Sequence, residues 1–137
     1  MNCLGFVGSD ALVETDASVR RGLETNPIFP LVARFAIAAR AEEVEQTTQR
    51  LRNKTPLTIA TSNPRQLEIT AARYGFRLRE IVVLGGAVES APDDDPEIDA
   101  VFDIVSSGKT MRANNLKIIA DNLQVLAITA VWKKPTN

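Results

Sequence analysis

The sequence of 137 residues contains no histidine and a single cysteine, Cys3. The absence of histidine excludes histidine-based catalytic triads, histidine metal sites and histidine general bases. The single cysteine excludes an intrachain disulfide and a thiolate metal cluster, and it fits a reducing compartment. Any chemistry must therefore depend on carboxylates, lysine, arginine, hydroxyls or backbone donors, with a hard cation such as Mg²⁺ where a metal is needed.

Aromatic residues and net charge are also scarce. Aromatics make up 5% of the chain and the formal net charge is −1, which argues against a base-stacking platform and against attraction to nucleic acid or anionic membranes. No apolar run has the length needed to span a bilayer, and the first residues lack the basic region that opens a secretory signal. We therefore expect a cytoplasmic protein with no nucleic-acid or membrane partner.

The residues that are present are typical of one globular domain, with 45% hydrophobic and 24% charged residues. Short apolar segments bounded by turn residues predict strands at 3–7, 31–39, 57–61, 78–84, 100–105, 116–120 and 125–132. Helices are expected at 9–21, 41–52 and 65–74, with shorter helical turns at 87–91 and 111–114. This alternation predicts an α/β domain with a mixed, mainly parallel sheet.

Two segments allow more than one interpretation. The alanine-rich segment 31–39 also suits a helix, and Pro27 and Pro30 predict a loop before it. The three aspartates at 93–95 suit either a metal site or an exposed acidic loop over 92–96. The exposed loop is favoured, because flanking prolines and neighbouring like charges are typical of solvated turns.

Ligands of α/β domains bind at the C-terminal ends of the strands, where turns are expected at 8–10, 62–65, 85–89 and 106–110. The last turn carries Ser106, Ser107, Gly108, Lys109 and Thr110, between an apolar strand and a helix start. Small residues let backbone N–H groups approach a phosphate, and the lysine and hydroxyls add donors, so this layout suits an anion cradle. Asp103, near the end of the strand, could face ribose hydroxyls or a metal. The spacing is not that of a P-loop, and a polar turn capping a helix at Ser107 or Thr110 is the alternative.

Several segments resemble, in the same order, motifs of the ATP phosphoribosyltransferase family, which catalyses the first step of histidine biosynthesis. They are LTIATSNPR at 57–65, LGGAVESAP at 84–92 and DAVFDIVSSGKTMRANNL at 99–116. The family patterns are close to I-A-T-x-x-P, G-S-V-E-x-A-P and A-D-A-I-x-D-x-V-S-T-G-x-T-L-x-x-N-G-L. The segment CLGFVGSDA at 3–11 is similar to the family's D-L-G-I-x-G-x-D-x-L, whereas 12–56 matches poorly.

The resemblance implies a fold like that of type II periplasmic binding proteins, with two α/β lobes and a cleft. It implies transfer of a phosphoribosyl group from phosphoribosyl pyrophosphate (PRPP) to N1 of ATP, with Mg²⁺ bound to the substrate. By position, residues 106–110 would hold the 5-phosphate of PRPP and Asp103 would lie beside the ribose. Gly8, Asp10 and Ala11 would border the nucleotide from the other lobe. Glu89 matches an acid of the second motif, and its role stays open between a site carboxylate and a helix-start carboxylate.

The sequence also departs from the family pattern. The family begins with a further segment that includes a K-G-R motif, and this sequence starts after it. Residues 1–30 are therefore expected to be a remnant of the first lobe, and 31–137 to form the second, PRPP-binding lobe of one compact domain. Asn115 stands where the family has glycine, Ala87 where it has serine, and Lys109 where it often has arginine.

A lobe without that segment would expose apolar surface, so we expect a homodimer or a hetero-complex with another subunit. The alternative function is a non-catalytic single-lobe module that binds a phosphorylated metabolite or a partner protein. The motifs alone assign no catalytic residue.

Overall fold

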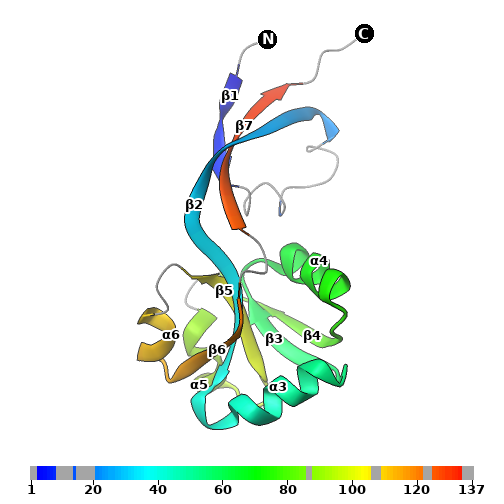
Figure 1. Ribbon diagram of the computed structural model, residues 1–137, viewed down its shortest axis with the longest axis vertical. Coiled ribbons are helices and arrows are strands. Elements are labelled where there is room, and N and C mark those ends of the chain that lie inside the picture. The colour runs from blue at the N-terminus through cyan, green and yellow to red at the C-terminus, as the bar shows by residue number, and fades with distance from the viewer. Residues whose placement is uncertain are drawn as a thin grey trace.

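The computed structural model describes residues 3–8, 14, 21–85, 88–105, 109–121 and 125–133 (Figure 1). Within this part of the chain the strands form one sheet of seven, in the order β1-β7-β2-β5-β3-β4, with β6 paired to β2. The strands are β1 (Cys3–Gly8), β2 (Leu23–Arg40), β3 (Leu57–Thr61), β4 (Leu78–Val83), β5 (Ala100–Val105), β6 (Leu116–Ala120) and β7 (Val125–Lys133). The α/β class and the mixed sheet expected from the sequence are confirmed.

The sheet has two parts that share β2 (Figure 1). The first part of β2 pairs with β7, which pairs with β1, and all of these pairs are antiparallel. The second part of β2 pairs antiparallel with β5 and β6. Together with β3, β4 and the helices, these strands form the α/β lobe of the structure. Parallel pairing joins β3 to β4 and to β5. Parallel pairs are thus fewer than the sequence suggested, because β2 runs antiparallel to all its neighbours.

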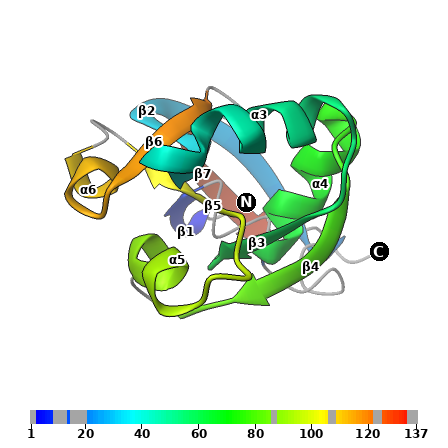
Figure 2. The ribbon, with the colours of Figure 1, turned by 90° about the horizontal axis from the view of Figure 1, so that it is seen from below.

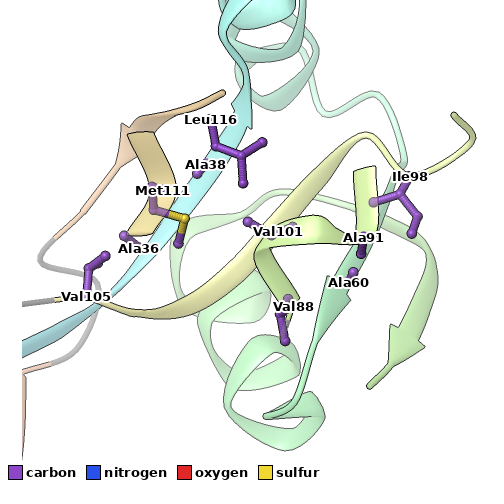
Figure 3. Packing of buried hydrophobic residues seen from close by; sticks show 10 residues of the cluster. All are labelled: Ala36, Ala38, Ala60, Val88, Ala91, Ile98, Val101, Val105, Met111 and Leu116. Carbon is purple, nitrogen blue, oxygen red and sulfur yellow. The ribbon is translucent and has the colours of Figure 1, made fainter. Parts of the chain in front are cut away.

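Helices cover both faces of the lobe (Figure 2). The helical elements are η1 (Ala41–Glu43), α3 (Val44–Arg52), α4 (Pro64–Tyr74), η2 (Val88–Ser90), α5 (Ala91–Asp94) and α6 (Lys109–Ala113). Leu51 of α3 and Leu67 of α4 pack with Phe35 and Phe102 on one face, where the two rings stack with centroids 4.8 Å apart. The second face carries residues of η2, α5 and α6 against the sheet (Figure 3).

The alternating direction of side chains in β2 explains these two cores. Phe35 and Ile37 belong to the first cluster, whereas Ala36 and Ala38 belong to the second. All residues from Phe35 to Ala39 have an exposed fraction of 0%. Met111 of α6 lies beside the small side chains of Ala36 and Ala38, whereas Val88 of η2 lies by Val101 of β5 and Ala60 of β3 (Figure 3).

The prediction of a loop at Pro27 and Pro30 is wrong, because β2 runs through both residues. The pairing of β2 with β7 shifts register between Pro27 and Phe29 and again between Pro30 and Arg34. Proline has no N–H to donate, so the ladder is interrupted at these points while the strand continues. The strand prediction at 31–39 is confirmed, and its helical alternative is excluded.

The acidic segment 92–96 also differs from its prediction, because Pro92, Asp93 and Asp94 lie in α5 rather than in a loop. Proline fits the first turn of a helix, and aspartates there interact favourably with the helix dipole. The predicted helix at 9–21 lies outside the described residues except for Glu14 and Arg21, which are helical. Among the described residues, no helix has the length and hydropathy needed to cross a membrane.

Residues at its two ends determine where α4 begins and ends. Pro64 is its first residue, and Gly75 ends it in the left-handed conformation with φ of 78°. The Gly75 N–H donates to the Ala71 carbonyl at 2.8 Å, which satisfies one of the last carbonyls of the helix.

We expect Gly75→Ala to lower the free energy of unfolding by about 1–2 kcal/mol, because a Cβ disfavours left-handed backbone. A Cβ at Gly75 would meet no atom within 4 Å, so crowding does not contribute. Gly75→Asn should cost less, since asparagine adopts this conformation more readily. Urea unfolding of the purified variants measures both effects.

Gly85→Ala is the matched control. Its Cβ also meets nothing within 4 Å, and Gly85 does not have a positive φ. We expect a change within about 0.5 kcal/mol. Equal losses of stability for Gly75→Ala and Gly85→Ala would contradict the conformational explanation.

Candidate carboxylate site at the C-terminal edge of the sheet

Three parallel strands end at the same edge of the sheet. Thr61 of β3 pairs with Val83 of β4 and with Phe102 of β5. The chain leaves β3 toward the start of α4, and it leaves β4 through Leu84, whose N–H donates to the Thr61 carbonyl at 2.9 Å. The positions that follow Phe102 on β5 lie at this edge too, so the edge gathers segments from three of the predicted turns.

Asp103 and Glu89 are brought together here. Asp103 is half-buried on β5 and belongs by alternation to the face of Val101 and Val105. On the same face, η2 packs through Val88 (Figure 3). The next residue of η2 is Glu89, whose carboxyl is hydrogen-bonded to that of Asp103. The Ile104 N–H donates to Asp103 Oδ1 at 2.8 Å. The two candidate carboxylates therefore form one pair.

The surroundings raise the pKa of Asp103 from its ordinary value of 3.8 to about 7. Burial is the largest cause, because it disfavours the charged form, and the hydrogen bond and charge of Glu89 act in the same direction. The Ile104 N–H opposes the shift by stabilising the carboxylate. Near neutral pH the Asp103 carboxyl can accept a hydrogen bond from a hydroxyl or give up a proton, which suits contact with a sugar or a cationic centre.

The structure places the other predicted site residues as follows. Gly8 is the last residue of β1, and Lys109 and Thr110 begin α6. Asp10, Ala11, Ser106, Ser107 and Gly108 lie outside the described residues. The roles of these residues stay predictions. The described residues also hold no group of three or more potential metal ligands.

Glu14, which no sequence pattern selected, caps the start of α4. Its carboxylate accepts hydrogen bonds from the backbone N–H groups of Arg65 and Gln66, at 3.1 and 3.0 Å. A local signal existed in α4, which has no acidic residue in its first turn and no side-chain cap from Asn63. That signal shows that a cap is needed, but it does not identify a residue more than fifty positions away.

A hollow of about 410 Å³ lies between the end of β4 and α5. It is lined by Val82, Leu84, Gly85, Ser90, Ala91, Asp94, Asp95 and Ile98. Ser90 of η2 lines the hollow and is the chain neighbour of Glu89, whereas neither Glu89 nor Asp103 lines it.

We expect the raised pKa of Asp103 to make stability depend on pH. Because the folded chain keeps a proton that the unfolded chain loses, this contribution is complete below pH 3.8 and is lost as pH rises through about 7. Asp103→Asn removes the titration, so its free energy of unfolding should improve relative to the unmodified chain between pH 4 and 7. Urea unfolding across this range measures the difference.

Asp94→Asn is the control, because Asp94 is exposed on α5. Its stability profile should run parallel to that of the unmodified chain. A difference between Asp103→Asn and the unmodified chain that stays constant from pH 4 to 8 would contradict the raised pKa.

Comparisons with known proteins match nearly the whole chain to one family. The family model for ATP phosphoribosyltransferase (HisG) matches residues 2–135. ATP phosphoribosyltransferases of Oceanobacillus iheyensis and Symbiobacterium thermophilum are each 31% identical over 134 residues, which is 96% and 95% of this chain. The matches cover 57% and 58% of those relatives, so the chain spans little more than half of their length.

A solved structure shows the same fold. The chain is similar to the ATP phosphoribosyl transferase (HisG:HisZ) complex from Thermotoga maritima, with a TM-score of 0.62 and 24% identity. The likeness covers 96% of this chain and 58% of that one. The family match over residues 2–135 and the relatives that are 31% identical over 134 residues show that the chain belongs to the ATP phosphoribosyltransferase family.

Proposed function

We propose that the chain carries the PRPP-binding part of an ATP phosphoribosyltransferase, which transfers the phosphoribosyl group of PRPP to N1 of ATP in histidine biosynthesis. The observation that carries the proposal is the Asp103–Glu89 carboxyl pair, at the strand edge where the family's motifs converge. The family match over residues 2–135 supports it. A cytoplasmic location and binding of ATP belong to the same proposal.

The predicted phosphate loop follows β5 directly. Residues 106–110 would hold the 5-phosphate through backbone N–H groups, hydroxyls and the ammonium group of Lys109. Asp103, three positions before the loop, would accept a hydrogen bond from a ribose hydroxyl. Gly8, Asp10 and Ala11 would border the adenine nucleotide. Mg²⁺ would enter as part of the substrate, bound to the pyrophosphate of PRPP.

In the reaction, the N1 lone pair of ATP forms a bond to C1 of the ribose. The bond from C1 to the pyrophosphate oxygen breaks, and pyrophosphate leaves with that electron pair. Positive charge develops on the ribose in the transition state, so rate depends on alignment of the two substrates and on nearby negative charge. Ionised Asp103, with Glu89 beside it, supplies such charge without a protein nucleophile.

We also propose that the chain works in an oligomer, either as a homodimer or with a different subunit. The relative of known structure is described as a complex of two proteins, HisG and HisZ.

The binding part of the proposal predicts that PRPP with Mg²⁺ binds the purified chain in a calorimetric titration. Lys109→Ala should weaken that binding by about 1.5–3 kcal/mol, the range for a hydrogen bond to a charged group. Lys117→Ala is the matched control, because it removes the same charge from an exposed position on β6. It should leave the affinity unchanged.

No binding at millimolar PRPP would contradict the proposal. Binding of PRPP without turnover, even when candidate partner subunits are present, would instead favour the non-catalytic binding module. Equal losses of affinity in Lys109→Ala and Lys117→Ala would assign the effect to general electrostatics rather than to the loop.

The oligomer predicts a molar mass of at least twice the 14.9 kDa of one chain in sedimentation equilibrium at micromolar concentration. If the partner is a different subunit, the purified chain should shift to the larger mass only when that subunit is added. A mass of one chain under both conditions would contradict the proposal.

A further inference from the structure

A second hollow, of about 210 Å³, opens on the face of the sheet that α3 and α4 cover. Its lining comes from the end of α3, the end of α4 with the chain just after it, and two strands of the sheet. The lining residues are Leu51, Arg52, Tyr74, Phe76, Ile37 and Ala120. All except Arg52 and Tyr74 belong to the core cluster of Phe35 and Ile37 or pack against it. The hollow is therefore an opening into that core.

This hollow is separate from the carboxyl pair of Asp103 and Glu89. Its lining segments from α3 and α4 directly precede β3 and β4, so they lie toward the N-terminal ends of these parallel strands. The carboxyl pair lies at the C-terminal edge. The faces also differ, because Ile37 belongs to the first cluster and Asp103 to the face of the second. A ligand in the hollow would leave the proposed PRPP site open.

The walls of the hollow are apolar and include an exposed aromatic residue. Tyr74 is 53% exposed and is one of three large hydrophobic residues with such exposure in the described part of the chain. Phe76, which is 8% exposed, lines the hollow with it. A cavity of about 150 Å³ in a protein core holds a benzene molecule. A hollow of about 210 Å³ therefore has room for one ring with a short side arm.

The surroundings of the hollow are positively charged. The sequence has no aspartate or glutamate over 46–67 or 69–79, the two segments that supply four of the lining residues. Arg52 is exposed and lines the hollow, and the exposed Arg73 and Arg77 each adjoin a lining residue in the chain. Among the described residues, no carboxylate forms an ion pair with any of these three arginines. This unbalanced positive charge favours an anion.

The two helix ends beside the hollow do not cancel this charge. The last carbonyls of a helix carry partial negative charge, equivalent to about half an elementary charge, which repels anions. Backbone N–H groups engage some of these carbonyls: Asn53 donates to Gln49 at 2.9 Å at the end of α3, and Gly75 donates to Ala71 at 2.8 Å at the end of α4. The full charges of three arginines outweigh the two partial charges.

We propose that this hollow binds a small aromatic carboxylate, with its ring against Tyr74 and Phe76 and its carboxylate paired with Arg52. A mostly apolar pocket with one charged group fixes a ligand that has an apolar body and one charge of opposite sign. A guanidinium group can donate two parallel hydrogen bonds to a carboxylate, which also fixes the orientation of the ligand. The inference does not depend on the proposed function, because the two sites share no residue.

Phenylacetate is the probe, because it has one ring and a carboxylate on a short arm. It is added to the ¹⁵N-labelled full chain at constant ionic strength, and binding is followed through the shifts of assigned amide resonances. The amides of Arg52, Tyr74 and Phe76 should shift with a common Kd of about 1 mM, which is expected for so small a ligand. Acetate lacks the ring, and benzylamine has the same ring and arm with a positive charge. Neither should cause saturable shifts at these amides.

Arg52→Gln should weaken the binding of phenylacetate about tenfold, the loss expected for a hydrogen bond between charged groups. Arg73→Gln is the matched control, because it removes the same charge beside Tyr74 from a side chain that does not line the hollow. It should change the Kd by less than about twofold, since an exposed charge outside the pocket contributes little. Both arginines are exposed, and urea unfolding of each variant verifies that the fold is kept.

The absence of saturable shifts with phenylacetate would overturn the inference, and equal binding of benzylamine would overturn the choice of an anion. Equal losses in Arg52→Gln and Arg73→Gln would assign the effect to general electrostatics and remove the role of Arg52. Saturating Mg²⁺-PRPP should leave the Kd for phenylacetate unchanged, and displacement of phenylacetate would contradict a separate site. If PRPP fails to bind while phenylacetate binds as expected, the proposed function fails and this inference stands.

Discussion

The backbone pairing of β2 is the constraint on which the rest of the structure depends. This strand, Leu23–Arg40, pairs with β7 along its first part and with β5 and β6 along its second part. At Arg34 the pairing changes over, because this residue is opposite Val105 of β5 and Val125 of β7. One continuous strand thus fixes the ribbon of β1 and β7 relative to the α/β lobe. The complete burial of residues 35–39 makes a shift of this register expensive, since a shift by one residue would exchange the phenylalanine and alanine faces.

The candidate site follows from that register. Pairing of β2 with β5 places Asp103 opposite Ala36, on the face of the sheet against which η2 packs. Glu89 lies on η2, and its carboxyl is hydrogen-bonded to that of Asp103. A distant ion pair supports the opposite end of the same strands: Asp99 accepts the Thr58 N–H at 2.8 Å and pairs with Arg50 of α3 at 2.8 Å. Contacts near both ends of β5 therefore fix the strand that carries Asp103.

Local chemistry was sufficient to predict much of this structure from the sequence. The predicted bounds of β3, β5 and β6 are confirmed, as are Pro64 at the start of α4 and Gly75 at its end. Asn115 stands where the family has glycine, and its φ of 57° shows why a glycine suits the position and why asparagine can replace it. The errors at Pro27 and Pro30 have the opposite origin. Pairing with the neighbouring strand β7 keeps the chain extended through Pro27 and Pro30, although each proline alone favours a break in the strand.

The site residues show the same division between local and distant causes. Asp103 and Glu89 could be selected separately from motifs, but their separation of fourteen positions does not predict that the two carboxyl groups meet. Their hydrogen bond requires η2 to pack on β5, and the packing depends on Val88 and Val101, which are buried in the same cluster. Holding two carboxyl groups together in a half-buried place costs stability once both are charged. A fold tolerates such a cost at sites that bind or react, and here the cost lies at the edge of the sheet where an α/β domain receives its ligand. The structural reason for the raised pKa of Asp103 is thus also the reason to regard this edge as the functional one.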